Sequence, residues 1–251
     1  FNGSQETQEK IRKTKRNILR LKRGLESFQG DDPMVPVCVD SKIVASVISG
    51  WTGIPVGKMM ANEIQTVLSL KNIIEQRIIG QSSAIDSICR RIKTSRALLD
   101  DPGKPIGVFL LVGPSGVGKT ETALALADTL YGGEKNLIKV NMSEYQEPYT
   151  VSNLKGAPPG YVGYGQGGIL TEAVRRTPYS VVLLDEIEKA HTDVTEVFYQ
   201  VFDKGSMEDS EGLTVDFKNT VILLTCNIGT DFIMEECTNG ERSLGIKDLE
   251  T

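Results

Sequence analysis

The stretch that most constrains the fold is the octapeptide Gly-Pro-Ser-Gly-Val-Gly-Lys-Thr at residues 113–120. An apolar run at 106–112 precedes it, as expected for a buried parallel strand, and good helix formers follow at 121–127. The octapeptide has the spacing of a phosphate-binding loop, in which backbone N–H groups and the start of a helix face the phosphates. The sequence therefore predicts a strand, a glycine-rich loop and a helix that together hold a nucleotide.

The residue types in this loop have separate chemical roles. Lys119 is expected to reach the β- and γ-phosphates of ATP, and the Thr120 hydroxyl is expected to ligate Mg²⁺. The predicted nucleotide-binding residues of the loop are Gly113, Pro114, Ser115, Gly116, Val117, Gly118, Lys119, Thr120 and Glu121.

Two further apolar runs end in polar side chains. The run at 181–184 leads into Asp185 and Glu186, and the run at 221–225 leads to Asn227. Asp185 suits the Mg²⁺ shell, Glu186 suits a base that polarises an attacking water, and the Asn227 amide suits the water or the γ-phosphate. Together with the loop, these strand ends predict a nucleotide hydrolase with Lys119, Glu186 and Asn227 as catalytic residues.

The composition of the chain argues against several other classes of protein and kinds of site. The 251 residues are enough for one α/β domain with appendages, and the net charge of −5 argues against a general nucleic-acid binder. His191 is the only histidine, which excludes histidine-based metal sites and Ser-His-Asp chemistry. The four cysteines show no metal-binding spacing and are expected to be reduced. No apolar run is long enough to insert into a membrane, and no leader follows Phe1. We expect a cytoplasmic location and a piece of a longer protein.

We divide the chain into a helical arm at 1–30, a linker at 31–61 and an α/β domain at 62–251. The arm is basic and repeats apolar residues at heptad-like spacing, which favours a packing helix over a nucleic-acid or membrane contact. In the linker, we expect a short helix at 41–48, ended by Gly50, and a breaker-rich stretch that Trp51 clamps.

The α/β domain alternates expected helices and strands. One helix begins at Asn62 and carries Ile64, Val67, Leu68 and Ile74. The next places Ile85, Ile88, Cys89 and Ile92 on one face. A strand at 137–140 and helices at 169–176 and 192–202 complete the pattern. This alternation predicts a parallel sheet with helices on both faces and a nucleotide at the carboxyl ends of the strands.

A glycine- and proline-rich loop at 156–168 displays Tyr161 and Tyr164 on a nearly uncharged backbone. A long loop in a compact domain is usually functional, and an exposed aromatic can hold extended polypeptide by sequence-tolerant apolar contact. Beside a nucleotide site, this loop favours a motor that moves polypeptide.

Several motifs together resemble the second AAA+ ring domain of the Clp heat-shock-100 unfoldases, from about Gln29 to Asp231. They are the Gly-Pro-Ser-Gly-Val-Gly-Lys-Thr-Glu, Gly-Ala-Pro-Pro-Gly-Tyr-Val-Gly-Tyr, Tyr-Ser-Val-Val-Leu-Leu-Asp-Glu-Ile-Glu-Lys-Ala-His and Val-Asp-Phe-Lys-Asn-Thr sequences. The stretch at 51–59 is similar to the family's linker. The resemblance implies a P-loop AAA+ large subdomain that lacks its C-terminal lid, works as a homo-hexamer and acts on polypeptide.

The resemblance also implies roles residue by residue. Lys119 and Thr120 would be the Walker A residues, Asp185 and Glu186 the Walker B pair, and Asn227 the sensor-1 amide. Ile78 and Ile79 resemble the pair that brackets the adenine. The substrate pore loop would comprise Gly160, Tyr161, Val162 and Gly163.

Some family features are altered or missing. Residues 204–212 would form a secondary pore loop, but Leu213 stands where an arginine is common. No segment after Asn227 resembles the family's arginine finger or sensor-2 arginine, and Arg242 lies in a different local sequence. We therefore expect this chain by itself to bind nucleotide weakly and to hydrolyse it poorly.

Within the family, residues 125–133, 201–205 and 207–209 resemble ClpV, the type VI secretion ATPase, more than the disaggregase ClpB. This resemblance implies that the substrate is a contractile secretion sheath. Three alternatives stay open: a ClpB-like disaggregase, an unfoldase that feeds a Clp-type peptidase through Leu244-Gly245-Ile246, and modules of another class. The modules of another class are a nucleic-acid loader and a nucleotide-gated scaffold.

Overall fold

The computed structural model describes residues 2–29, 39, 41–52, 63–97, 99–161, 165 and 167–238. The chain divides into two compact units, residues 1–44 and 45–251. The first unit contains α1 (Asn2–Gln29), whose apolar residues Ile11, Ile18 and Leu21 are exposed. The predicted basic helical arm is therefore a helix.

One expectation about the linker is wrong. The helix α2 (Ser41–Thr52) runs through Gly50 instead of ending before it. An interior glycine costs a helix only about 1 kcal/mol relative to alanine, which is too little to end it. Trp51 lies in the last turn of α2 and is 77% exposed among the described residues, so its predicted role as a clamp stays a prediction. Residues 53–62, the rest of the predicted clamped stretch, lie outside the described residues.

A four-stranded parallel sheet is the centre of the second unit. Its strands lie in the order β1 (Gly107–Val112), β6 (Val221–Cys226), β3 (Val181–Asp185) and β2 (Leu137–Asn141). The four strands match the apolar runs in the sequence, so the predicted parallel sheet is confirmed.

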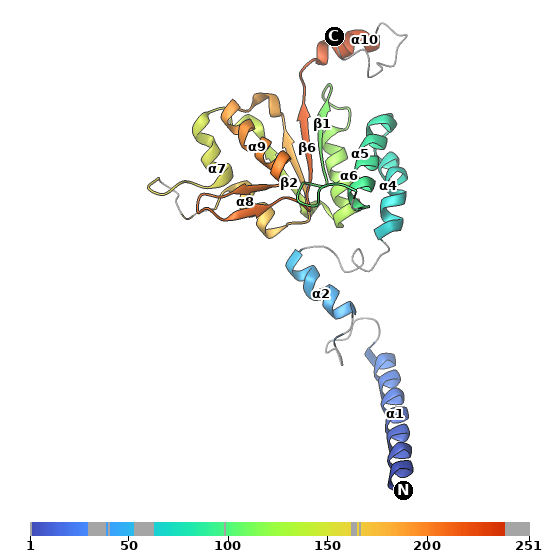
Figure 1. The fold of residues 1–251 in the computed structure, drawn as a ribbon. Coiled ribbons are helices and arrows are strands. Elements are labelled where there is room, and N and C mark those ends of the chain that lie inside the picture. The colour runs from blue at the N-terminus through green and yellow to red at the C-terminus, as the bar shows by residue number, and fades with distance from the viewer. Residues whose placement is uncertain are drawn as a thin grey trace. The chain divides into compact units, whose positions relative to one another are not determined.

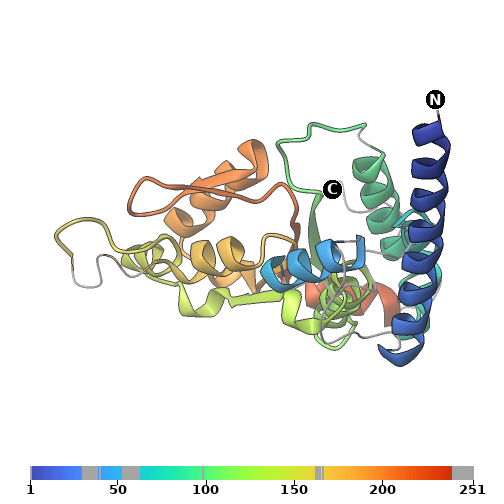
Figure 2. The same ribbon diagram turned by 90° about the horizontal axis from the view of Figure 1, so that it is seen from below.

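Helices cover both faces of this sheet, as Figures 1 and 2 show. One layer contains α4 (Glu63–Arg77), α5 (Ser82–Arg96) and α6 (Lys119–Tyr131). The other contains α7 (Val151–Lys155), α8 (Ile169–Arg176) and α9 (Thr192–Lys204). The helix α10 (Thr230–Thr238) follows β6, and single 3₁₀ turns occupy Glu134–Asn136, Met142–Glu144, Pro148–Thr150 and Ile187–Lys189.

Successive side chains of a central strand serve different layers. Val181 and Leu183 of β3 pack with α4, α5 and α6, whereas Val182 and Leu184 pack with the opposite layer. A strand covered on both faces needs apolar residues at every position, because neighbouring side chains point to opposite sides. This requirement explains the uninterrupted apolar runs in the sequence.

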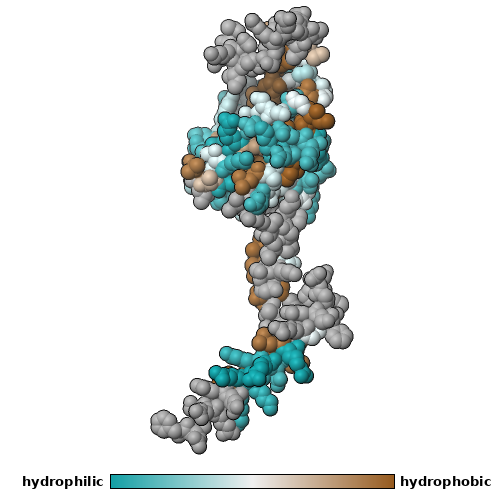
Figure 3. Space-filling model, turned by 90° about the vertical axis from the view of Figure 1, so that its right-hand side faces the viewer, coloured by the Kyte–Doolittle hydropathy of each residue, from teal (hydrophilic) through white to brown (hydrophobic). Residues whose placement is uncertain are grey.

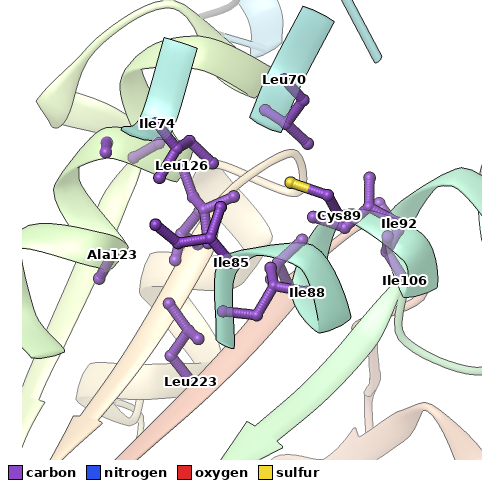
Figure 4. Packing of buried hydrophobic residues seen from close by; sticks show 14 of the residues in the cluster. Leu70, Ile74, Ile85, Ile88, Cys89, Ile92, Ile106, Ala123, Leu126 and Leu223 are labelled. Carbon is purple, nitrogen blue, oxygen red and sulfur yellow. The ribbon is translucent and has the colours of Figure 1, made fainter. Parts of the chain in front are cut away.

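The core below α5 contains the predicted face Ile85, Ile88, Cys89 and Ile92, all buried (Figure 4). On α4, Leu70 and Ile74 are buried, whereas Leu68 is 58% exposed. The outer face of this layer is mostly hydrophilic, with scattered hydrophobic residues (Figure 3).

The strand β1 forms one edge of the described sheet. Its side chains Val108, Leu110 and Val112 are 37%, 58% and 51% exposed. In the register they align with Ile222, Leu224 and Cys226 of β6, two of which belong to the core beneath α8 and α9. This part of β1 therefore presents apolar surface on the side of α9.

The sequence did not predict the antiparallel hairpin of β4 (Ser206–Glu208) and β5 (Thr214–Asp216). Both strands have three residues, too few for a periodic signal. Met207 and Val215 anchor the hairpin in the core with α8 and α9.

Among the described residues, none of the helices combines the length and apolar character that crossing a bilayer requires.

Candidate nucleotide-binding site

The glycine-rich loop connects the carboxyl end of β1 with the first turn of α6. Gly116 and Gly118 have φ values of 86° and 97°, in the left-handed region that residues with a Cβ avoid. A Cβ on Gly118 would also lie 3.4 Å from Cγ2 of Ile78. The loop therefore needs glycine at these positions, and it directs backbone toward the N-terminus of a 13-residue helix. This geometry suits a phosphate group.

The Lys119 ammonium lies inside the curve of this loop. It donates to the carbonyl oxygens of Gly113 and Pro114, the latter at 3.0 Å, and to Oδ1 of Asn227 at 2.7 Å. Asn227 directly follows β6, the neighbour of β1 in the sheet. The structure thus brings together the predicted lysine and the predicted amide, which are far apart in the sequence.

Asp185 ends β3 and is held by two neighbours. Thr225 on β6 donates its hydroxyl to Oδ1 at 2.6 Å, and Lys139 on β2 forms an ion pair with Oδ2 at 2.9 Å. Burial alone raises the pKa of Asp185, but these hydrogen bonds outweigh burial and hold the pKa below its ordinary value. Asp185 is therefore a carboxylate at neutral pH, as a ligand of Mg²⁺ requires.

Glu186 has φ 59° and ψ 51°, and it is the only non-glycine residue with positive φ in the described part of the chain. Its backbone N–H donates to the Thr225 hydroxyl at 3.0 Å, and its carboxylate pairs with Lys189 at 2.7 Å. A left-handed backbone costs such a residue about 1–2 kcal/mol, so tertiary contacts must hold it. Strained backbone of this kind is concentrated at functional sites.

Sequence reasoning missed four residues that support these groups. Thr225 connects Asp185 with Glu186, and Glu188 accepts a hydrogen bond from the Asn227 backbone at 3.1 Å. The other two are Lys139 and Lys189. Lys189 is next to the Asp-Glu pair in the sequence, so its proximity gave a signal. Thr225 and Lys139 gave none, because only the strand order places them beside Asp185.

The remaining predicted nucleotide contacts lie around the loop. Ile78 is buried against Gly118, whereas Ile79 is 91% exposed. Glu121, in the first turn of α6, pairs its carboxylate with Arg77 at 2.7 Å. The Glu121 carboxylate therefore lies beside Arg77, the last residue of α4. The adenine-bracketing role of the two isoleucines stays a prediction.

A cavity of about 510 Å³ adjoins the loop. Its lining includes the loop itself, one face of α5 and the first part of α10, through Gln81, Ala84, Ile85, Ile88, Pro114, Val117, Lys119, Ile233 and Met234. This volume is within the ordinary range of about 300–1,000 Å³ for small-molecule sites, and the lining is largely apolar. The cavity therefore offers an apolar region next to a cationic one.

The donor groups fit a magnesium–nucleotide complex. The Thr120 hydroxyl and the Asp185 carboxylate are oxygen ligands of the kind that Mg²⁺ prefers, and Mg²⁺ usually completes its shell with phosphate oxygens and water. In the described part of the chain, no group of three histidine, cysteine, aspartate or glutamate side chains could hold a metal ion unaided.

The loop predicted to contact polypeptide is separate from this site. Gly160 and Tyr161 are described, and Tyr161 is 70% exposed. Val162, Gly163 and Tyr164 lie outside the described residues. His191 caps α9, because its Nδ1 accepts the Asp193 N–H at 3.2 Å.

The fold and the motifs define the class of the protein. Residues 104–250 match the family described as AAA domain (Cdc48 subfamily). The chain belongs to this family of ATPase domains, and within it to the Clp/heat-shock-100 type.

Individual relatives refine the assignment. AAA+ ATPase ClpV1 of Pseudomonas aeruginosa is 63% identical over 224 residues, which cover 89% of this chain and 25% of that protein. Chaperone protein ClpB of Yersinia enterocolitica is 56% identical over 226 residues, or 90% of this chain and 25% of that protein. ClpB of Bacteroides thetaiotaomicron is 49% identical over 227 residues, or 90% and 26%. The chain spans about a quarter of the length of these relatives. The resemblance to the Clp heat-shock-100 ATPases is confirmed, and the assignment to the second ring stays a prediction.

Proposed function

We propose that this chain is the ATP-binding and ATP-hydrolysing part of a ring-forming protein unfoldase, corresponding to the second ring domain. One observation carries this proposal: the ends of β1, β3 and β6 bring Lys119, Asp185, Glu186 and Asn227 to one edge of the sheet. An AAA+ ATPase of the Clp type needs these four groups together.

Each group has a defined task. Lys119 would leave the loop carbonyls to neutralise the β- and γ-phosphates, while Thr120 and Asp185 would hold Mg²⁺. The bound Mg²⁺ would supply positive charge to the transferring phosphoryl group. Glu186 would accept a proton from the attacking water once its carboxylate separates from Lys189.

Asn227 would orient the water or the γ-phosphate from the end of β6. It contacts Lys119 directly, and its backbone is fixed by Glu188. This arrangement suits a sensor of the bound nucleotide. When Lys119 moves to the phosphates, the Asn227 side chain is released while its backbone stays bonded to Glu188.

Tyr161 would hold the substrate polypeptide. Its exposure and its place on a glycine-rich loop support sequence-tolerant apolar contact. The working state would be a cytoplasmic homo-hexamer that does not bind nucleic acid and does not insert into a membrane. The hexamer and the location rest on the family assignment.

The finer proposal is that the substrate is a contractile sheath of type VI secretion. It is supported by the ClpV-like motifs and by the 63% identity to ClpV1. A ClpB-like disaggregase is the second candidate, because the identity to ClpB of Yersinia enterocolitica is only slightly lower at 56%. The third is a peptidase-associated unfoldase, whose Leu244-Gly245-Ile246 signal lies outside the described residues.

The full-length protein tests the proposal with two variants and one control. Tyr161→Ala should hydrolyse ATP but fail to thread polypeptide, whereas Glu186→Gln should bind ATP without turning it over. Tyr149→Ala is the matched control, because Tyr149 is also exposed (75%) but lies on another turn. Normal threading by Tyr161→Ala would contradict the proposal that Tyr161 holds the polypeptide.

Two further measurements address the finer points. Sheath disassembly and reactivation of aggregated protein, compared in parallel, distinguish the first two candidates. The 251 residues alone should hydrolyse ATP roughly 10³–10⁵-fold more slowly than the full-length protein, because no arginine-finger motif occurs among them. Fast turnover that does not depend on protein concentration would contradict this expectation.

A further inference from the structure

The loop that carries Tyr161 and the β4–β5 hairpin lie side by side, as both ribbon views show (Figures 1 and 2). We refer to residues 156–168 as the Tyr161 loop and to residues 206–216 as the hairpin. Gly156 and Gly167 form an antiparallel bridge that closes the Tyr161 loop at its base. Ser210 of the hairpin donates its N–H to the Lys155 carbonyl at 3.2 Å. This bond joins the hairpin to Lys155, the last residue of α7, which directly precedes the Tyr161 loop.

Their approach is close. A Cβ on Gly156 would lie 2.5 Å from Oγ of Ser210 in the hairpin. At the other end of the loop, a Cβ on Gly168 would lie 2.0 Å from the carbonyl oxygen of Leu154 on α7. Contacts this short leave no room for a side chain at either end of the loop. The hairpin turn is packed directly against the base of the Tyr161 loop.

Asp209 organises the hairpin side of this contact. Its side chain is only 5% exposed, and its Oδ1 accepts the N–H groups of Glu211 and Leu213, both at 2.9 Å. Its Oδ2 accepts a hydrogen bond from the Arg175 guanidinium. Burial alone raises the pKa of Asp209, but these hydrogen bonds outweigh burial and lower the pKa. The carboxylate is charged and fully engaged.

Arg175 ties the hairpin to α8, the helix that begins at Ile169 directly after the Tyr161 loop, and it also pairs with Glu172 on the same helix. Glu172 in turn packs against the end of the loop, where a Cβ on Gly167 would lie 2.3 Å from its Cγ. A buried carboxylate that loses its cationic partner is strongly destabilised. Arg175 therefore opposes opening of the hairpin away from α8, in addition to the buried Met207 and Val215.

We propose that Arg175 is a positioning residue that joins the Tyr161 loop and the β4–β5 hairpin into one unit, so that displacement of either loop is transmitted to the other. The proposal rests on the function proposed above, in which Tyr161 holds the polypeptide. It adds that the hairpin, which lacks the arginine common at position 213, acts through its connection with Tyr161.

Arg176 provides the matched control. It is adjacent on α8, its side chain is 80% exposed, and its recorded ion pair is a 3.9 Å contact with Glu172. Arg175→Gln and Arg176→Gln therefore remove the same charge from the same helix, but only the first removes the partner of Asp209.

Hydrogen exchange of the full-length protein, followed by mass spectrometry, tests the connection directly. Arg175→Gln should accelerate exchange at least about tenfold in peptides from both the Tyr161 loop and the hairpin, given the strength of hydrogen bonds to charged groups. Arg176→Gln should change neither segment. Acceleration confined to the hairpin, or equal effects of the two variants, would overturn the proposal.

Asp209→Asn tests the Arg175–Asp209 ion pair by changing its carboxylate partner. Its amide oxygen can still accept from Glu211 and Leu213, while its NH₂ group faces Arg175. The double variant Arg175→Gln/Asp209→Asn should accelerate exchange no more than the stronger single variant, because both remove one interaction. Additive effects of the two substitutions would contradict the coupling.

A functional measurement separates this inference from the proposed function. The probe is fluorescein-labelled casein, an unfolded polypeptide, and the readout is casein taken up per ATP hydrolysed. Arg175→Gln should lower this ratio several-fold, and Arg176→Gln should not. A normal ratio in Arg175→Gln together with a defective Tyr161→Ala would overturn the inference alone. A normal ratio in Tyr161→Ala would instead contradict the proposed function, in which Tyr161 holds the polypeptide, whatever the exchange data show.

Discussion

At the scale of single residues, the site depends on side chains that sequence motifs do not include. Thr225 is the clearest case, because its hydroxyl donates to Asp185 and accepts from the Glu186 backbone. It is 1% exposed, so water cannot replace either bond. A single hydroxyl thus positions both acidic residues of the proposed hydrolysis site.

The substitution Thr225→Val should therefore lower both stability and turnover. We expect a loss of about 1–3 kcal/mol in the free energy of unfolding, because a buried polar group loses its partner. Turnover of the full-length protein at saturating ATP should fall by more than tenfold. Thr220→Val is the control: its buried hydroxyl donates to the Phe217 carbonyl at 2.7 Å, just before the other end of β6. Equal turnover in the two variants would contradict the role of Thr225.

The buried thiols give a second prediction at this scale. Burial raises the pKa of Cys89 to about 11, and the side chain is 1% exposed. At pH 8 the reactive thiolate is therefore scarce as well as shielded. Iodoacetamide should leave Cys89 unmodified in the folded chain and modify it in 6 M guanidinium chloride, as peptide mass spectrometry would show. Rapid labelling of folded protein would indicate that α5 opens readily.

At the scale of elements, the difference between α4 and α5 shows where periodicity is sufficient. The predicted face of α5 is the buried face, because one apolar stripe packs on one sheet. On α4, apolar residues occur on several sides, and the neighbours α5 and α6 decide which are covered. Leu70 is buried and Leu68 is exposed for that reason.

Two leucine substitutions on α4 check this assignment. Leu70→Ala should cost about 2–5 kcal/mol, because it removes a fully buried side chain and leaves a cavity. Leu68→Ala should change stability by less than about 0.5 kcal/mol. Urea unfolding of the 251-residue chain, monitored by circular dichroism, measures both values. A large loss for Leu68→Ala would show that this face of α4 is covered in solution.

At the scale of the whole molecule, both hydrophobic cores are built from residues between Leu70 and Leu224. Among the described residues, the members of both cores come from the unit of residues 45–251.

Removal of residues 1–44 should leave the main thermal transition unchanged. Calorimetry of residues 45–251 beside the complete 251 residues gives the comparison. For a unit of this size, a decrease of about 2–4 °C corresponds to roughly 1 kcal/mol. A larger decrease would mean that the first unit stabilises the second.

The sequence alone determined the class of fold and the proposed chemistry. The apolar runs and the loop at 113–120 specify parallel strands and a phosphate-binding turn, because local backbone geometry and burial on both faces leave few alternatives. The same patterns predicted the site residues Lys119, Asp185, Glu186 and Asn227, because each lies at the end of an apolar strand or in the loop. These features are encoded within short segments.

Tertiary structure decided what depends on segments distant in the chain. The order β1-β6-β3-β2 places Thr225 and Lys139 beside Asp185, and the packing of the hairpin on α8 places Asp209 beside Arg175. No local pattern specifies these pairs, because hydrogen bonds and ion pairs between strands and helices depend on which elements become neighbours.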